Sequence, residues 1–245
     1  HTEIMLKNFK ANININKKDN YNCIQIIGNK ELVPQNINIP GDFSSASFLI
    51  VASLINKNSE VEIKNINLNP TRIGFLTAIK NMRGNILIKN KKEQNGEIVA
   101  DIVSKSSNLI GCNLNKEMAE LMIDEFPILS IAASFANSPS VFKGLEELKI
   151  KESNRLELIK INLNKCGIFC EINNNDLFID PTKKNSIKDN NIKTDFDHRI
   201  AMSFAVLGSK IGKLQINESD SINTSFPSFK EQFNRAGGNL IWKKL

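Results

Sequence analysis

The sequence predicts a mixed α/β (α+β) fold: one lobe of three βαβαββ repeats with pseudo-threefold symmetry, with buried helices inside and sheets outside. Two patterns recur at intervals of about 70–80 residues, and a fixed period is the signature of a repeated structural unit. The composition agrees with a folded core, because 41% of the 245 residues are hydrophobic and 24% are charged. The longest apolar runs, 46–55 and 126–136, are about half of the ~20 residues that a bilayer-spanning helix needs, so we expect no membrane segment.

The first recurring pattern is an amphipathic helix that ends at a small residue and leads directly into an apolar strand. Its four small residues are Ala11, Gly84, Gly167 and Gly237. Glycine just after a helix adopts the left-handed conformation at little cost, which lets the chain turn sharply. We therefore expect a helix–strand junction at each of these positions.

The second pattern is an aspartate followed by a helix-length run of aliphatic and small residues. The three runs follow Asp42, Asp124 and Asp197. They are apolar nearly all round, which indicates helices that are buried on most faces. Amphipathic helices are expected to start about thirty residues later, at Asn69, Lys151 and Thr224. Runs of alternating β-branched residues predict strands between the helices, at 61–68, 141–150 and 214–217.

These patterns divide the chain into two parts. Residues 41–245 are expected to form one lobe, with repeats at about 41–105, 106–180 and 181–245. Residues 1–40 hold a fourth helix–strand element and a Pro-bounded stretch that we interpret as a hinge to a preceding lobe. The chain opens at His1 in what reads as mid-helix, without a capping residue. We therefore expect it to be the C-terminal part of a longer protein.

The charge and the cysteines narrow the function classes. The net charge is +6, but the lysines are scattered, and no dense basic run is interleaved with aromatic residues, so we expect no nucleic-acid partner. A positive field also suits small anionic substrates. The four cysteines form no CxxC pair and have no histidine at metal-ligand spacing, which predicts a cytoplasmic protein without a metal site.

Cations lie at or near several expected helix starts, where the helix dipole disfavours positive charge. They are Arg72, Lys151, Arg155 and Arg199. Free N–H groups and guanidinium groups that converge on one face would bind phosphate or carboxylate. For Asp42 and Arg72, a helix cap and an exposed arginine are the simpler explanation. Arg199 heads a buried helix and needs a partner, although Arg155 could simply pair with Glu152 one turn away.

Two adjacent carboxylates, Asp124 and Glu125, lie between the apolar pairs Met122-Ile123 and Phe126-Pro127. Carboxylates in such flanks are costly as structural elements, and they are useful as a catalytic acid or base. This pair is therefore a candidate for proton transfer.

Six strings resemble the 5-enolpyruvylshikimate-3-phosphate (EPSP) synthase family, in that family's order and from end to end of the chain. They are GDFSSASF (41–48), NPTRIGF (69–75), IDEFPILSIAA (123–133), KESNRLE (151–157), DHRIAMSFAV (197–206) and TSFPSF (224–229). The resemblance implies the two-lobed enolpyruvyl transferase fold. It also implies transfer of a carboxyvinyl group from phosphoenolpyruvate to the 5-hydroxyl of shikimate 3-phosphate, with release of phosphate, in aromatic amino acid biosynthesis. No metal or organic cofactor is implied.

The resemblance also implies a role for each site residue. Asp124 resembles the base near the 5-hydroxyl, Glu152 the group that handles the proton at C3, and Lys151 a cation that bridges both substrates. Arg155 and Arg199 would clamp the phosphate and carboxylate of phosphoenolpyruvate, with a bidentate geometry that lysine cannot reproduce.

The chain departs from the family at two positions. Thr224 stands where many relatives have a lysine, so one phosphate contact is in question. Asn154 stands where Asp or Thr is common, which we expect to change only a local helix cap.

Three alternatives remain open. A transferase acting on UDP-N-acetylglucosamine shares the fold but would need other motifs in place of KESNR and DHRIAM. A non-catalytic anion-binding domain could keep the same scaffold, and a nucleic-acid-binding domain is suggested only by the pI of about 9.1. By resemblance we expect a monomer at full length. We also expect these 245 residues alone to fold but to be inactive, because the remaining shikimate 3-phosphate ligands would lie in the missing part.

Overall fold

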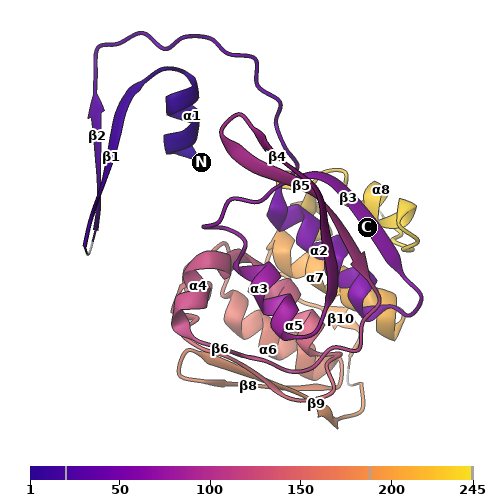
Figure 1. Ribbon diagram of the computed structural model, residues 1–245. Coiled ribbons are helices and arrows are strands. Elements are labelled where there is room, and N and C mark those ends of the chain that lie inside the picture. Colours follow the sequence, from indigo (N-terminus) through magenta and orange to yellow (C-terminus); the bar gives the residue numbers. More distant parts are fainter. Residues whose placement is uncertain (20, 188, 244–245) are drawn as a thin grey trace.

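The computed structural model describes residues 1–19, 21–187 and 189–243 and has a mixed α/β fold, as the sequence predicts (Figure 1). The α-helices are α1 (Thr2–Asn8), α2 (Phe43–Ile55), α3 (Gly74–Asn81), α4 (Lys116–Met122), α5 (Phe126–Ala133), α6 (Arg155–Lys165), α7 (His198–Ile211) and α8 (Phe229–Arg235). Short 3-10 helices are η1 (Ile123–Glu125), η2 (Glu146–Ile150) and η3 (Ser219–Thr224). Within the described part of the chain, no helix has both the length and the apolar character needed to cross a membrane.

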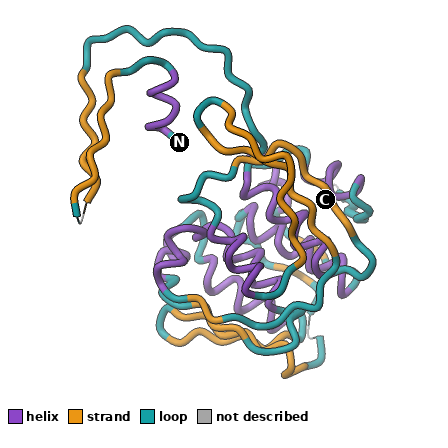
Figure 2. Tube along the Cα trace, in the orientation of Figure 1, coloured by secondary structure: helices purple, strands orange, loops and turns teal. Residues whose placement is uncertain are grey.

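The strands form one small sheet for each successive part of the chain. They are β1 (Asn12–Lys18), β2 (Tyr21–Ile27), β3 (Glu60–Asn67), β4 (Asn85–Gln94), β5 (Glu97–Lys105), β6 (Asn113–Leu114), β7 (Ser140–Phe142), β8 (Ile168–Asn173), β9 (Asp176–Lys184), β10 (Asn191–Ile192) and β11 (Gln215–Ile216). The orders are β1-β2, β3-β5-β4, β6-β7-β9-β8 and β10-β11. In Figure 2 the helices of the lobe gather in its middle, and the larger sheets lie on its outside.

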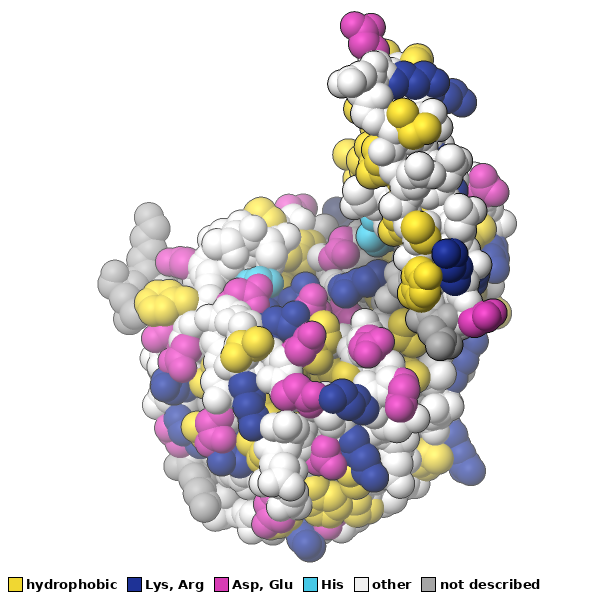
Figure 3. Space-filling view, turned by 90° about the vertical axis from the view of Figure 1, so that its left-hand side faces the viewer, with side chains coloured by type: hydrophobic (Ala, Val, Ile, Leu, Met, Phe, Trp, Pro, Cys, Tyr) yellow, Lys and Arg dark blue, Asp and Glu magenta, His cyan; other side chains and the backbone are white. Residues whose placement is uncertain are grey.

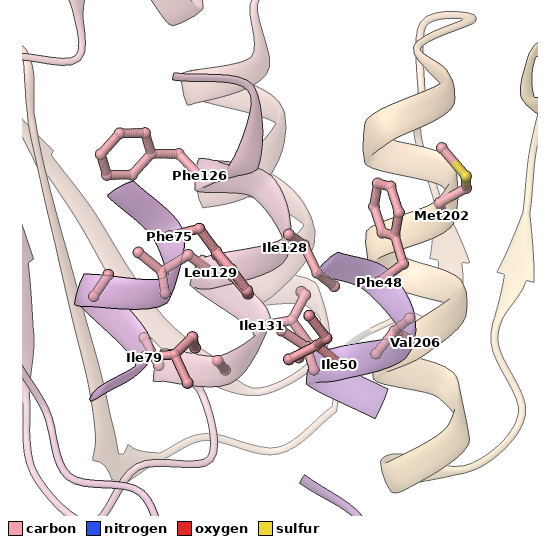
Figure 4. Close-up of a cluster of buried hydrophobic side chains, with 14 of the residues drawn as sticks. Phe48, Ile50, Phe75, Ile79, Phe126, Ile128, Leu129, Ile131, Met202 and Val206 are labelled. Atoms are coloured by element: carbon pink, nitrogen blue, oxygen red, sulfur yellow. The ribbon is translucent and has the colours of Figure 1, made fainter. Parts of the chain in front are cut away.

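The helices α2, α5 and α7 form the centre of the lobe, so the prediction of three buried apolar helices is confirmed. Their apolar side chains point toward one another in Figure 4, where Ile50, Ile131 and Val206 meet from the three helices. Serines are tolerated in this core because their hydroxyls donate to the preceding helical turn, as Ser130 Oγ does to the carbonyl of Phe126 at 2.8 Å. Close packing of these helices brings their N-terminal ends together.

The amphipathic helices begin four or five residues later than the sequence predicts, because polar side chains first organise a turn. Helix α3 begins at Gly74, after the Asn69 side chain has accepted hydrogen bonds from Thr71. Helix α6 begins at Arg155, after Asn154 has capped it by accepting from the Glu157 amide at 3.1 Å. Helix α8 begins only at Phe229, after η3.

Two expected strands also differ from the structure. Of residues 141–150, only the beginning lies in a strand, because Gly144 turns the chain at φ +70° and η2 follows. After Gly237 no strand forms among the residues described. There the side-chain amide of Asn234 pairs with both the N–H and the carbonyl of Leu240, at 2.7 and 3.0 Å, in place of a neighbouring strand.

Residues 1–19 and 21–40 form a separate arm. Helix α1 leads into the antiparallel β1–β2 hairpin, and an extended segment then runs back to the lobe (Figure 1). Figure 3 shows this arm projecting above the lobe with hydrophobic side chains on its surface; Ile26, for example, is 57% exposed. The interpretation of this segment as a hinge and the repeat boundaries remain predictions.

The four positions where helix–strand junctions were expected turn the chain in two ways. At Gly167 and Gly237 the glycine itself has a positive φ, +80° and +97°. At the other two junctions the residue before the small residue takes this conformation instead: Lys10 at φ 62° and Arg83 at φ 61°. Glycine's conformational freedom is therefore required at only two of the four positions.

Gly167→Ala is expected to lower the free energy of unfolding by about 2–4 kcal/mol, since it combines left-handed strain with overpacking. A Cβ at residue 167 would lie 2.5 Å from the carbonyl oxygen of Asn185, which is backbone and has little room to move. Gly237→Ala is the matched control, because its Cβ would meet no atom within 4 Å. Urea unfolding should show the larger loss for Gly167→Ala, and equal losses would contradict the steric argument.

Candidate active site

The carboxylate of Asp124 lies at the centre of a cluster of four cations. Arg155 Nη1 donates to Asp124 Oδ1 at 3.0 Å, and Lys151 Nζ is 3.8 Å from the same oxygen. On the other side, Arg72 Nη2 and Arg199 Nη2 lie 3.6 and 3.8 Å from Asp124 Oδ2. The site residues predicted from the sequence therefore meet in one place.

Different elements bring these side chains together. Asp124 is in η1, a short turn just before the buried helix α5. Lys151 and Glu152 lie between η2 and α6, whereas Arg155 is the first residue of α6. Arg199 is in the first turn of α7. Because the helices converge in the core, the segments before them converge at one end of the lobe.

Arg155 is fully buried and surrounded by carboxylates. Its Nε donates to Asp197 Oδ2 at 2.8 Å, its Nη1 donates to Asp124, and its Nη2 donates to Glu152. Ser153 Oγ also donates to Asp197 Oδ2, at 2.9 Å. These bonds fix the guanidinium plane and tie α6 to the segment before α7.

Asp197 has two functions in this network. Its Oδ1 accepts from the backbone amide of Arg199 at 2.9 Å, so it caps α7, and its Oδ2 balances Arg155. From the sequence alone, an anionic ligand is expected to balance the cations at the helix starts. In the structure, protein carboxylates already face them, and a ligand would compete with those carboxylates.

The environment of Asp124 favours its ionised form. Burial opposes ionisation, but the positive charges of Arg199, Arg155, Lys151 and Arg72 outweigh it and lower the pKa of Asp124. The side chain is 22% exposed, so solvent or a ligand reaches it. An ionised, accessible carboxylate at neutral pH can accept a proton.

Glu152 lies at the edge of the cluster. Its side chain is 50% exposed, and Arg155 is its ion-pair partner. Arg199 is mostly buried and donates from Nη1 to the backbone carbonyl of Asp124 at 3.3 Å. The cluster thus combines an inner, fixed carboxylate with an outer carboxylate that has room to move.

Of the two explanations of Arg72, an exposed arginine and a member of the converging cations, the structure favours the second, because Arg72 Nη2 lies 3.6 Å from Asp124 Oδ2. Nothing in the NPTR string itself shows that the 69–73 turn points toward Asp124. Asp42 is a helix cap, as expected, since it accepts from the Ser45 amide at 2.7 Å. At Thr224, the hydroxyl donates to the Ser221 carbonyl at 2.7 Å within its own turn.

Comparison with known proteins decides the family. A profile of EPSP synthase (3-phosphoshikimate 1-carboxyvinyltransferase) matches residues 1–233. The chain belongs to the EPSP synthase family. Among curated members named 3-phosphoshikimate 1-carboxyvinyltransferase, it is 41% identical to the one from Zymomonas mobilis over 245 residues, or 98% of this chain and 54% of that protein. It is 38% identical to the one from Paramagnetospirillum magneticum, with the same coverage of each chain.

A solved EPSP synthase structure from Acinetobacter baumannii agrees with the fold. It superimposes with a TM-score of 0.86 at 34% identity, and the match covers 96% of this chain and 54% of that one. The enolpyruvyl transferase fold inferred from the sequence is thereby confirmed. This chain spans about half the length of the EPSP synthases that it matches, and membership of their family disfavours the UDP-N-acetylglucosamine alternative.

Proposed function

We propose that the whole protein transfers the enolpyruvyl group of phosphoenolpyruvate to the 5-hydroxyl of shikimate 3-phosphate and releases phosphate. The observation that carries this proposal is the Asp124 carboxylate among four cations, three of which belong to the KESNR and DHR strings, in a member of the EPSP synthase family. Both substrates carry several negative charges, so a site rich in arginine and lysine is suited to them.

The two accessible carboxylates suit the two proton transfers of this reaction. Asp124 would take the proton of the 5-hydroxyl while that oxygen attacks C2 of phosphoenolpyruvate, and Glu152 would donate a proton to C3. The resulting tetrahedral ketal then loses phosphate and a C3 proton to give the enol ether. Glu152 is again the group placed to take that proton.

The cations would bind the anionic groups of the substrates by exchanging partners. Lys151 is partly exposed and 3.8 Å from Asp124, so it would bridge the two substrates. Arg199 and Arg155 would bind phosphoenolpyruvate. Because all three donor groups of Arg155 already face carboxylates, this requires Glu152 to move aside, and its exposure allows that movement.

The other properties of the whole protein follow from the family and remain expectations. We expect a cytoplasmic monomer that needs no cofactor and binds no nucleic acid. Among the described residues, no group of three or more His, Cys, Asp or Glu side chains is arranged to hold a metal ion.

Phosphate release with both substrates tests the proposal. The 245-residue chain alone is expected to show no turnover. The part of the Zymomonas mobilis relative that the match does not cover is expected to supply the first lobe. A chimera that joins this part to the 245-residue chain, here called the completed enzyme, is expected to be active. In it, Glu152→Gln is expected to lower kcat by about 10²–10⁴-fold.

The matched control is Glu231→Gln, which removes an exposed carboxylate that pairs with Arg235 on α8. It should leave kcat unchanged. Full activity of Glu152→Gln would favour the non-catalytic anion-binding alternative for this lobe, and turnover by the chain alone would refute the expectation that a second lobe is needed.

A further inference from the structure

The carboxyl group of Glu125 is fully buried next to the candidate base, and the reaction described above makes no use of it. Its Oε1 accepts a hydrogen bond from Ser44 Oγ in the first turn of α2. Its Oε2 is also buried and has no hydrogen-bond partner among the described residues. A buried carboxyl with an unpartnered oxygen is costly, particularly as an anion, and it calls for an explanation.

The surroundings of Glu125 favour its uncharged form. Charged groups face it from the 69–73 turn (Arg72), from α7 (Arg199) and from its own neighbour Asp124, while α2 contributes only the hydroxyl of Ser44. Arg72 Nη2 lies 3.8 Å from Glu125 Oε1, which is beyond hydrogen-bond distance. Burial raises the pKa of Glu125, and the hydrogen bond from Ser44 and the two arginines only partly offset this effect.

A chain of polar contacts connects Glu125 with Asp124. The hydroxyl of Ser44 donates to Glu125 and accepts from Arg72 Nη2 at 3.4 Å. The same Arg72 nitrogen lies 3.6 Å from Asp124 Oδ2. Ser44 and Arg72 belong to the expected first repeat, and the two carboxyls belong to the second, so these contacts also join the two units.

We propose that Glu125 is a positioning residue: through Ser44 it holds Arg72 against Asp124, and so keeps the candidate base oriented. The raised pKa of Glu125 favours its protonated form in this role. The expected effect of Glu125 on catalysis rests on the proposed function. The contacts that join Glu125, through Ser44 and Arg72, to Asp124 do not depend on it. An ionised Glu125 would compete with Asp124 for Arg72 and would add a like charge beside it, which would oppose ionisation of the base.

Carbon-13 NMR of the side-chain carboxyls tests the arrangement in the 245-residue chain without any need for activity. The Glu125 signal is assigned by its loss in Glu125→Gln. We expect Glu125 to remain protonated at pH values above the ordinary titration range of a glutamate. We also expect Arg72→Gln and the smaller change Ser44→Ala to raise the titration midpoint of Asp124. The control is Arg235→Gln, which changes a remote, exposed arginine and should leave the titration midpoint of Asp124 unchanged.

Two NMR results would overturn the proposal. One is a Glu125 carboxyl that titrates within the ordinary range of a glutamate or at lower pH. The other is an Asp124 midpoint that does not move in either Arg72→Gln or Ser44→Ala, with the fold of each variant verified from its spectrum.

The completed enzyme gives a second, functional readout. Glu125→Ala is expected to lower kcat roughly ten- to a hundredfold with little change in KM, because it disturbs the orientation of a reacting group. Glu125→Gln, which is neutral and can still accept from Ser44, should restore most of that loss. If Glu125→Gln is as impaired as Glu125→Ala, a charged Glu125 is required and the proposal fails. If the unmodified completed enzyme releases no phosphate, the proposed function fails, and NMR still decides the arrangement.

Discussion

Replacing Asp124 with asparagine is expected to lower the kcat of the completed enzyme by about 10²–10⁴-fold, the usual contribution of a general base. Asparagine keeps the size and the hydrogen-bonding ends of the side chain, but it cannot accept the proton of the 5-hydroxyl. The four cations around residue 124 lose their shared counter-ion, so binding of the anionic substrates should not weaken. A selective loss of kcat is therefore expected, with KM unchanged or lower.

The pH dependence follows from the pKa of Asp124. Burial acts to raise it, but the attraction of Arg199, Arg155, Lys151 and Arg72 lowers the pKa below its usual value. The base form, and with it kcat, is thus present above the folded-state pKa and lost as the pH falls through it. The same ionisation stabilises the fold above the unfolded-state pKa of an aspartate, and that stability is lost over the same acidic range.

Steady-state phosphate release between acidic and neutral pH measures the kcat of each variant and how that kcat depends on pH. Asp189→Asn serves as the control, because it removes an exposed carboxylate whose partner, Lys165, lies 3.3 Å away on the surface. It should change neither kcat nor the acidic limb. An Asp124→Asn enzyme with normal kcat would show that another group is the base.

The sequence predicted the buried helices because their pattern is local. An apolar run such as Phe43–Ile55 identifies a helix without reference to its neighbours, and its aspartate at residue 42 is a cap by local chemistry. The strings that hold the site residues could also be recognised from the local sequence alone. Their meeting at Asp124 depends on the packing of α5, α6 and α7, which periodicity alone does not specify.

The parts that were missed depend on contacts between distant segments. The local sequence around Arg72 fits both an exposed arginine, which was preferred, and a cation of the site, and only the packing of the first unit against η1 brings Arg72 to 3.6 Å from Asp124. The loop at Leu240 reads as a strand because its apolar pattern fits one, yet the side chain of Asn234 takes both of its backbone groups. In both cases tertiary contacts override local preference.

Arg155 is the residue whose loss should most affect stability. Its side chain is fully buried, and so is that of its partner Asp197, at 2.8 Å. Arg155→Met keeps much of the volume but leaves the Asp197 carboxylate buried without its cation. Removal of one member of a buried ion pair costs about 3–5 kcal/mol, so we expect a loss of this size in the free energy of unfolding, measured by urea denaturation. Arg235→Met, in an exposed pair, should cost less than about 1 kcal/mol.

A second substitution separates the buried charge from simple loss of packing. Asn at residue 197 can still cap α7, but it carries no charge, so Arg155→Met combined with Asp197→Asn removes both members of the pair. If the stranded carboxylate causes the loss, the double variant should regain about 1–3 kcal/mol relative to Arg155→Met. Asp197→Asn alone should be destabilising, because Arg155 would then keep only the partly exposed Asp124 and Glu152 as counter-ions. Additive losses in the double variant would instead mean that Arg155 stabilises the lobe through its packing, and that the ion pair contributes little.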